Sequence, residues 1–92
     1  MPRLIIPDDV SASIRTLHPH LKKKVRSSLE RILNDFHAGK RLVDELEGLH
    51  SFRTGRFRII YRVTRKNDIE LVAVGPRARI YEDTYRIIKK QN

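Results

Sequence analysis

Arginines gather in two short stretches of the sequence, SFRTGRFRIIYRV at residues 51–63 and GPRARIY at residues 75–81. A guanidinium group is a planar fork of N–H donors that grips phosphate oxygens two at a time and stays charged. A tyrosine beside such groups adds a hydroxyl and a face on which a base can stack. The sequence therefore predicts a phosphate-binding site built from Arg53, Arg56, Arg58, Arg62, Arg77, Arg79 and Tyr81.

Each of these residues also has an ordinary structural explanation. Charges such as Arg53 and Arg56 can simply keep an edge strand soluble, and this explanation is as strong as a functional one. A functional role is favoured for Arg58 and Arg77, because a hairpin that places residue 71 beside residue 61 would let both arginines converge on one phosphate-sized cleft. Tyr81 has the alternative of packing as a core residue against the C-terminal helix.

Composition and charge set the class of protein and of partner. The 92 residues, of which 39% are hydrophobic, suit a single small domain spanning residues 1–92. Residues 51–92 carry eleven basic and four acidic side chains, a charge of +7 out of the total of +9, which favours an anionic partner. The chain has no cysteine, no apolar run long enough to span a bilayer and no secretory signal at its start, so we expect a cytoplasmic protein without a membrane partner.

The sequence contains none of the common phosphate-binding or hydrolase motifs and no metal-binding pattern. It contains no phosphate-binding G-x-x-x-x-G-K-[ST] loop, no G-x-G-x-x-G and no G-x-S-x-G. The four histidines are scattered, with no pair at helical i, i+4 spacing and no carboxylate motif between them. We therefore predict no metal site and no cofactor.

Two helices are predicted in the first half of the chain. A short strand at residues 3–6 is followed by Asp8 or Asp9 as a helix cap, and apolar residues at i, i+4 and i+7 continue that helix to about His18. A second, clearer helix begins at Leu21 and keeps its apolar spacing to Phe36. Its many basic residues are interpreted as a solvated face. Residues 42–49 form either a short helical turn or an irregular connection.

A sheet and a terminal helix are predicted in the second half. Residues 51–63 alternate with period two and predict one long strand, residues 65–68 a hairpin turn, and residues 69–75 a central strand that is apolar on both faces. A short C-terminal helix follows, with Tyr85, Ile88 and Tyr81 on its apolar face. The fold class is therefore α+β, with two N-terminal helices packed on a curved, mainly antiparallel sheet of about four strands.

Three motifs carry a more specific pattern: LEGL at residues 46–49, GRFRIIY at residues 55–61 and GPRARIYE at residues 75–82. Their order resembles that of the RelE/ParE superfamily of toxins from toxin–antitoxin systems. In that superfamily an L-x-G-L precedes G-R-[YF]-R-[IL]-[IV]-Y, and a Val-rich strand ends in G-x-R shortly before I-Y-E. With the two preceding amphipathic helices, the resemblance covers essentially the whole chain.

The resemblance implies a small cytoplasmic toxin with a microbial RNase-like fold, neutralised by a cognate acidic antitoxin. The RelE branch cleaves messenger RNA in the ribosomal A site, without a metal. In that reaction a ribose 2′-hydroxyl attacks the adjacent phosphate, leaving a cyclic phosphate and a free 5′-hydroxyl. The basic strand would then be the floor of an anion site, and the same face would attract the antitoxin.

Catalytic roles carry over by motif. Arg58 and Arg77 correspond to arginines that hold and stabilise the phosphate, and Tyr81 to an aromatic residue near the C-terminus. This chain departs from RelE at Arg53 and Gly55, where RelE has two closely spaced lysines. Arginine stays protonated and is a poor proton acceptor, so the general base is unassigned. Further contacts to nucleic acid are expected from Arg56, Arg62 and Arg79.

Two other functions are compatible with the same resemblance. Toxins of the ParE branch share the fold but poison DNA gyrase by binding it, with no hydrolytic centre of their own. A basic RNA-binding module without catalysis is a third possibility, ranked below the other two. The arginine and tyrosine set favours the ribonuclease.

Overall fold

The structure is a computed structural model that describes residues 2–91. The strands form one sheet in the order β1-β5-β4-β3-β2, in which β1 and β5 are parallel and all other neighbours antiparallel. The predicted α+β class and mainly antiparallel sheet are confirmed, with five strands where the sequence predicts about four. The elements are β1 (Leu4–Ile5), α1 (Asp8–Arg15), α2 (Pro19–Asn34), β2 (Lys40–Arg41), the 3₁₀ helix η1 (Asp44–Leu46), β3 (His50–Thr54), β4 (Phe57–Val63), β5 (Ile69–Pro76) and α3 (Ile80–Gln91).

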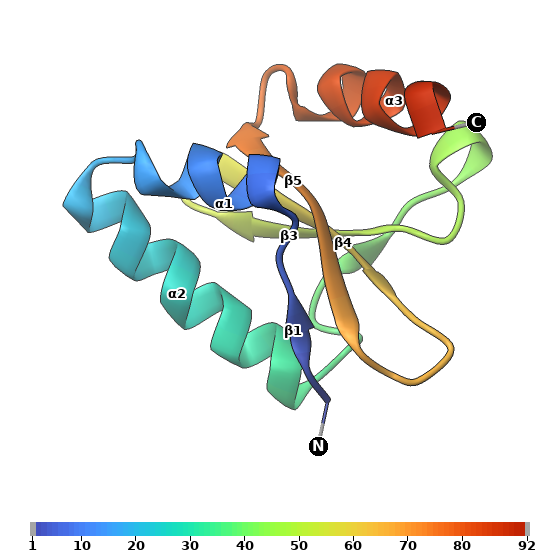
Figure 1. The fold of residues 1–92 in the computed structure, drawn as a ribbon, viewed down its shortest axis with the longest axis horizontal. Helices are drawn as coiled ribbons and strands as arrows, with labels where there is room; N and C mark the ends of the chain where they lie inside the picture. Colours follow the sequence, from blue (N-terminus) through green and yellow to red (C-terminus); the bar gives the residue numbers. More distant parts are fainter. Residues whose placement is uncertain (1, 92) are drawn as a thin grey trace.

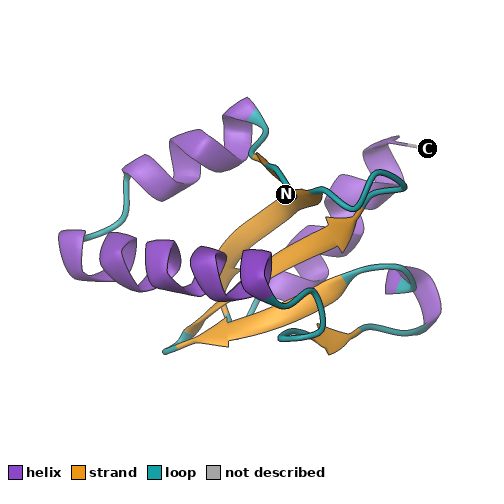
Figure 2. Cartoon of the chain, turned by 90° about the horizontal axis from the view of Figure 1, so that it is seen from below, coloured by secondary structure: helices purple, strands orange, loops and turns teal. Residues whose placement is uncertain are grey.

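Helices cover both faces of this sheet. Figure 1 shows α2 and α3 on opposite sides of the long strands, and Figure 2 shows α2 in front of the sheet with α3 behind it. The larger core lies under α1 and α2 and contains Val10, Val25, Leu29, Ile32, Phe52, Ile59, Tyr61, Ile69 and Leu71. The smaller core lies under α3 and contains Leu49, Ile60, Val72, Ala73 and Ile80. β5 contributes to both cores, which explains why its sequence is apolar on both faces.

The two N-terminal helices occur where the sequence predicts them, with different caps. α1 begins at Asp8 with Pro7 as its N-cap, so Asp8 and Asp9 lie in the first turn, near the positive end of the helix dipole, and neither side chain caps the helix. α2 begins two residues before the predicted Leu21, because Pro19 is tolerated at the first helical position. The Nδ1 atom of His18 accepts a hydrogen bond of 3.2 Å from the backbone N–H of His20 and so caps α2.

The predicted long strand at residues 51–63 is wrong, because a tight turn divides it into β3 and β4. Gly55 has a φ of 63°, in the left-handed region that glycine adopts without strain. Thr54 pairs with Phe57 and Arg53 with Arg58 across this hairpin. The period-two alternation continues on both sides of the turn, so the pattern alone does not reveal the reversal.

The next hairpin, between β4 and β5, lies at the predicted residues 65–68. The Thr64 backbone N–H donates to the carbonyl of Asp68 at 2.8 Å, and the Asp68 N–H donates to the Thr64 hydroxyl at 3.1 Å. Asp68 also receives the backbone N–H of Arg3 at 2.9 Å, which fixes the short strand β1 at the edge of the sheet. That hydrogen bond is the largest contribution holding the pKa of the Asp68 carboxyl below its usual range.

The buried face of α3 agrees with the predicted one at Ile88, which packs against the smaller core, and differs from it at the two tyrosines. Ile80 and Thr84 are buried, whereas Tyr81 and Tyr85 are exposed by 37% and 43%. A Cβ built on Gly75 would lie 3.1 Å from the Cδ1 of Ile80, so this glycine lets α3 begin close to the sheet. Docking through Ile80 turns the two tyrosines out of the core. Within residues 2–91, no helix has the length and apolar character needed to cross a membrane.

Candidate functional site

The side chains of β3 and β4 alternate between the two faces of the sheet. Phe52 and Ile59, which are paired, belong to the core under α2. Their neighbours Ser51 and Arg58 therefore project to the other face, which α3 covers. Ser51 pairs with Ile60, whose side chain packs with Ile80 at the start of α3. This arrangement brings the first turn of α3 over Ser51 and Arg58.

Ser51, Arg58 and Tyr81, here called the Arg58 cluster, contact one another at this point. The Ser51 hydroxyl oxygen accepts hydrogen bonds from Arg58 Nη1 at 3.1 Å and from the Tyr81 hydroxyl at 3.3 Å. The Arg58 guanidinium carbon lies 5.7 Å from the centre of the Tyr81 ring, within cation–π range. Arg58 is thus held in place by one face of the tyrosine and by the serine, and its Nε atom is buried without a hydrogen-bond partner among the described residues.

Arg53 lies directly opposite Arg58 on the neighbouring strand. Like charges at opposed positions of an antiparallel pair destabilise a sheet. The ion pairs among the described residues join Arg3 to Asp68, Arg62 to Glu70 and Arg86 to Glu82, and none of them compensates Arg53 or Arg58. A bound anion between the two arginines would offset this repulsion.

A second group of arginines, here called the arginine pocket, lines an open pocket of about 510 Å³ at the end of the β3–β4 hairpin. Arg53, Arg56 and Arg77 lie around it, together with Gly55, Pro76 and Ala78. The Arg77 backbone N–H donates to the Arg56 carbonyl at 2.8 Å, which extends the β4–β5 ladder to the pocket. Arg77 thus lies beside Arg56, whereas the sequence predicts that it converges on Arg58. Arg53 belongs to this pocket and also neighbours the Arg58 cluster.

Two of the predicted basic residues lie outside both groups. Arg62 pairs with Glu70 across β4 and β5, with Nε 2.8 Å from the carboxylate, so its charge is compensated. Arg79 is exposed in the turn before α3, where its backbone N–H donates to the Pro76 carbonyl at 3.1 Å. Neither residue contributes to the pocket at the hairpin.

His50 is an obvious proton carrier near this strand, but it lies on the opposite face. Its ring stacks on Tyr61 at 5.1 Å between centres, within the core under α2. Burial lowers the pKa of His50, and the nearby Arg41 lowers it further. The sheet therefore separates this imidazole from the Arg58 cluster.

Sequence reasoning missed Ser51 as a member of the site. Its hydroxyl is the acceptor that joins Arg58 to Tyr81, and the residue is only 2% exposed. The available signal was its place two residues before Arg53, on the same face of a strand. Among the described residues, no three histidine, aspartate or glutamate side chains are close enough together to hold a metal ion.

The fold is that of the toxins of toxin–antitoxin systems. The RelBE2 toxin–antitoxin complex from Mycobacterium tuberculosis matches with a TM-score of 0.72 and 21% identity, over 83% of this chain and 99% of that chain. The isolated RelE toxin from E. coli matches with a TM-score of 0.71 and 16% identity, over 96% and 99%. The YoeB–YefM complex from Staphylococcus aureus matches with a TM-score of 0.67 and 17% identity, over 80% and 94%.

The sequence identifies the family. Residues 8–81 match the model of the ParE toxin of type II toxin–antitoxin systems, so this chain belongs to that family, within the RelE/ParE superfamily. A comparison with curated proteins finds no match. The chain is thus a toxin of the type II toxin–antitoxin class.

Proposed function

We propose that this toxin is an endoribonuclease that cleaves messenger RNA in the ribosomal A site. The observation that carries the proposal is the Arg58 cluster, in which a serine and a tyrosine position an arginine that has no acidic partner within residues 2–91. A phosphodiester supplies the negative charge that this site lacks. Such an activity would place the protein in the cytoplasm.

In the proposed reaction, the ribose 2′-oxygen forms a bond to the adjacent phosphorus and the bond from phosphorus to the 5′-oxygen breaks. One proton passes from the 2′-oxygen to the 5′-oxygen, giving a cyclic phosphate and a 5′-hydroxyl. Arg58 stabilises the negative charge that grows on the phosphorane oxygens, because a guanidinium held in place by Ser51 and Tyr81 can donate charge-assisted hydrogen bonds to those oxygens. Arg53 adds charge from the opposite strand.

The neighbouring residues hold the RNA. The exposed ring of Tyr81 offers a base a face to stack on and keeps Arg58 in place. Arg56 and Arg77 bind the phosphate on one side of the scissile one, in the arginine pocket.

Proton transfer is the step for which the site is poorly equipped. No hydrogen bond or ion pair among the described residues joins a carboxylate or imidazole to Ser51, Arg58 or Tyr81, and arginine does not accept a proton. We infer that water or a ribosomal group moves the proton. This explains why activity would require the ribosome, which also holds the RNA in the geometry for in-line attack.

Gyrase inhibition is the second candidate, favoured by the match to the ParE toxin model. In that case the arginines form a binding surface and no bond is cleaved. The absence of a proton acceptor at the Arg58 cluster is compatible with such a purely binding role. An acidic antitoxin would neutralise either activity by covering the same face.

A translation extract separates the two candidates. With the wild-type toxin, mapping of transcript 5′ ends should reveal cuts in register with codons, and Arg58→Ala should abolish them while the domain stays folded. Arg86→Ala is the matched control, because Arg86 is exposed on the outer part of α3 and paired with Glu82. Uncut transcripts together with inhibited supercoiling by purified gyrase would establish the second candidate.

A further inference from the structure

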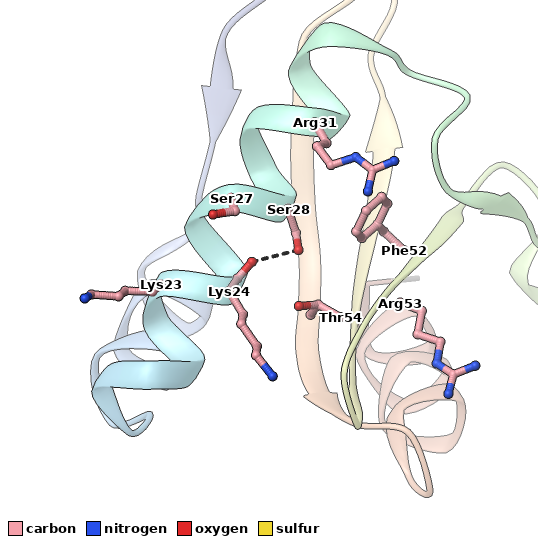
Figure 3. A pocket seen from close by; sticks show the side chains of 8 residues that line it. All are labelled: Lys23, Lys24, Ser27, Ser28, Arg31, Phe52, Arg53 and Thr54. Carbon is pink, nitrogen blue, oxygen red and sulfur yellow. Dashed lines mark hydrogen bonds between the residues drawn. The ribbon is translucent and has the colours of Figure 1, made fainter.

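A second basic groove lies between α2 and β3, on the face of the sheet opposite the Arg58 cluster (Figure 3). It has a volume of about 370 Å³. Its lining residues are Lys23, Lys24, Ser27, Ser28 and Arg31 from α2, and Phe52, Arg53 and Thr54 from β3. None of them is acidic, so the charge of the groove is positive throughout. The sequence pattern alone indicates only a solvated helix face here.

Lys24 and Arg31 are the cations that face β3. They lie seven residues apart on α2, which places them on the same side of the helix about 10 Å apart along its axis. Arg31 stacks over the Phe52 ring, with its guanidinium carbon 5.5 Å from the ring centre. Figure 3 shows the Lys24 side chain directed along the groove, whereas Lys23 points away from it. The ion pairs among the described residues include neither Lys24 nor Arg31.

The groove is continuous with the arginine pocket around the β3–β4 turn. Arg53 lines both. A Cβ built on Gly55, which lines the arginine pocket, would lie 3.8 Å from the Lys24 Nζ atom. The cations therefore form one band around the turn end of the hairpin, from Arg31 and Lys24 through Arg53 to Arg77.

We propose that this groove binds the phosphate backbone of the RNA strand beyond the arginine pocket, as a second anion subsite. The proposal rests on the proposed function, since it extends the path of the same RNA. A row of cations that carries no acidic residue is the arrangement that follows a single-stranded backbone. An acidic peptide would also need apolar anchors, and the Phe52 side chain is only 9% exposed beneath Arg31.

Binding of a nuclease-resistant 2′-O-methyl RNA of about twelve nucleotides, a length within known single-strand site sizes, tests the subsite without cleavage. The variant is the pair Lys24→Gln and Arg31→Gln, which removes two charges and keeps both stems. The matched control is Lys22→Gln with Arg26→Gln, two charges on the same helix that do not line the groove. Both variants should stay folded at the temperature of the binding assay, since all four residues are exposed, and melting curves verify this; a small loss of stability is expected only for the groove variant, which loses the contact between Arg31 and Phe52.

The groove variant should bind the RNA about tenfold more weakly than the control variant, and the slope of log K against log salt should fall by about 1.4, the value for two phosphate contacts on a single strand. A trinucleotide, too short to reach the groove, should bind both variants equally. Equal binding of the longer RNA by the two variants would overturn the proposal. So would an unchanged RNA affinity with weaker antitoxin binding, which would assign the groove to an acidic protein.

These results are independent of catalysis. If the groove variant binds RNA more weakly but the wild-type toxin leaves transcripts uncut, the subsite is supported and the ribonuclease is rejected. Codon-linked cleavage with equal binding by the two variants would support the ribonuclease and reject the subsite.

Discussion

At the scale of single residues, Ser51 is the centre of the candidate site. It lies beneath α3 and accepts one hydrogen bond from a strand residue, Arg58, and one from a helix residue, Tyr81. Its own hydroxyl hydrogen stays free to donate to a phosphate oxygen. A small hydroxyl residue at this buried position therefore fixes the relative placement of two functional groups.

Replacing Ser51 with alanine should lower the single-turnover cleavage rate about 10- to 100-fold, because a misplaced catalytic group loses much of its effect. The affinity for RNA should change little, since the arginines remain. Ser13→Ala, which removes an exposed hydroxyl bonded to the Asp9 carbonyl, serves as the control. A folded Ser51→Ala protein with the wild-type rate would contradict the positioning role.

Two variants of Tyr81 test whether its ring or its hydroxyl contributes to cleavage. Tyr81→Phe keeps the face under Arg58 and should cleave within a few-fold of wild type. Tyr81→Ala should lose about 1 to 3 kcal/mol of binding, the usual contribution of one base stacked on an aromatic ring. Single-turnover kinetics on programmed ribosomes measure both variants. A large fall in the chemical step for Tyr81→Phe would instead assign proton transfer to the hydroxyl.

At the scale of elements, the sequence predicts the class of the fold well and the site only in part. Apolar spacing locates α1, α2 and β5 because each has one or two apolar faces that pack against a core. The hairpin at Gly55 escapes detection, because one glycine within an unbroken alternation is a weak signal. Whether Tyr81 reaches Arg58 also depends on how α3 docks on the sheet. The close contact between Ile80 and Gly75 determines this docking. Such long-range contacts leave no local pattern.

The loop after α2 is held by a close contact with the sheet. The Tyr61 hydroxyl donates to the Phe36 carbonyl at 2.9 Å and accepts from the Gly39 N–H at 3.0 Å. A Cβ at Gly39 would lie 2.6 Å from that oxygen, and the fully buried ring has no room to retreat. Gly39→Ala should therefore destabilise the fold by about 1 to 3 kcal/mol, the usual penalty for overpacking.

Urea unfolding of Gly39→Ala measures this penalty. Combining it with Tyr61→Phe removes the oxygen involved in the closest contact, so the two losses should be less than additive. Strictly additive losses would show that the contact between Gly39 and Tyr61 does not decide the fit of the loop.

The edge strand β1 is held by hydrogen bonds from Arg3 to the Asp68 carboxylate, which can be protonated at low pH. Because hydrogen bonds from Arg3 lower the folded-state pKa of Asp68, its contribution to stability is full above the ordinary aspartate pKa of about 3.9 and is lost as pH falls through the lower folded value. Asp68→Asn should be less stable than wild type at pH 7 and should lack this part of the acid dependence. Unfolding curves from neutral pH to about pH 3 test both points; parallel curves would contradict them.

At the scale of the whole molecule, positive charge is concentrated at the turn between β3 and β4. The Arg58 cluster and the α2 groove lie on opposite faces of the sheet, and Arg53 connects them through the arginine pocket. Acidic side chains that form ion pairs do so elsewhere, with Arg3, Arg62 and Arg86. One end of the molecule thus presents a positive field without acidic partners among the described residues, which favours association with an anionic partner.

This field should control how fast the antitoxin binds more than how long it stays bound. Charge complementarity raises association rates, and salt screens it over about 10 Å at 0.1 M, whereas dissociation depends mainly on buried contacts. Stopped-flow association with the cognate antitoxin should therefore slow steeply between about 50 and 200 mM salt, while the dissociation rate changes little. The Lys24→Gln, Arg31→Gln pair should flatten the dependence of the association rate on salt, because it removes charge from the same band. An association rate that does not respond to salt would show that the basic end of the molecule does not steer its partner.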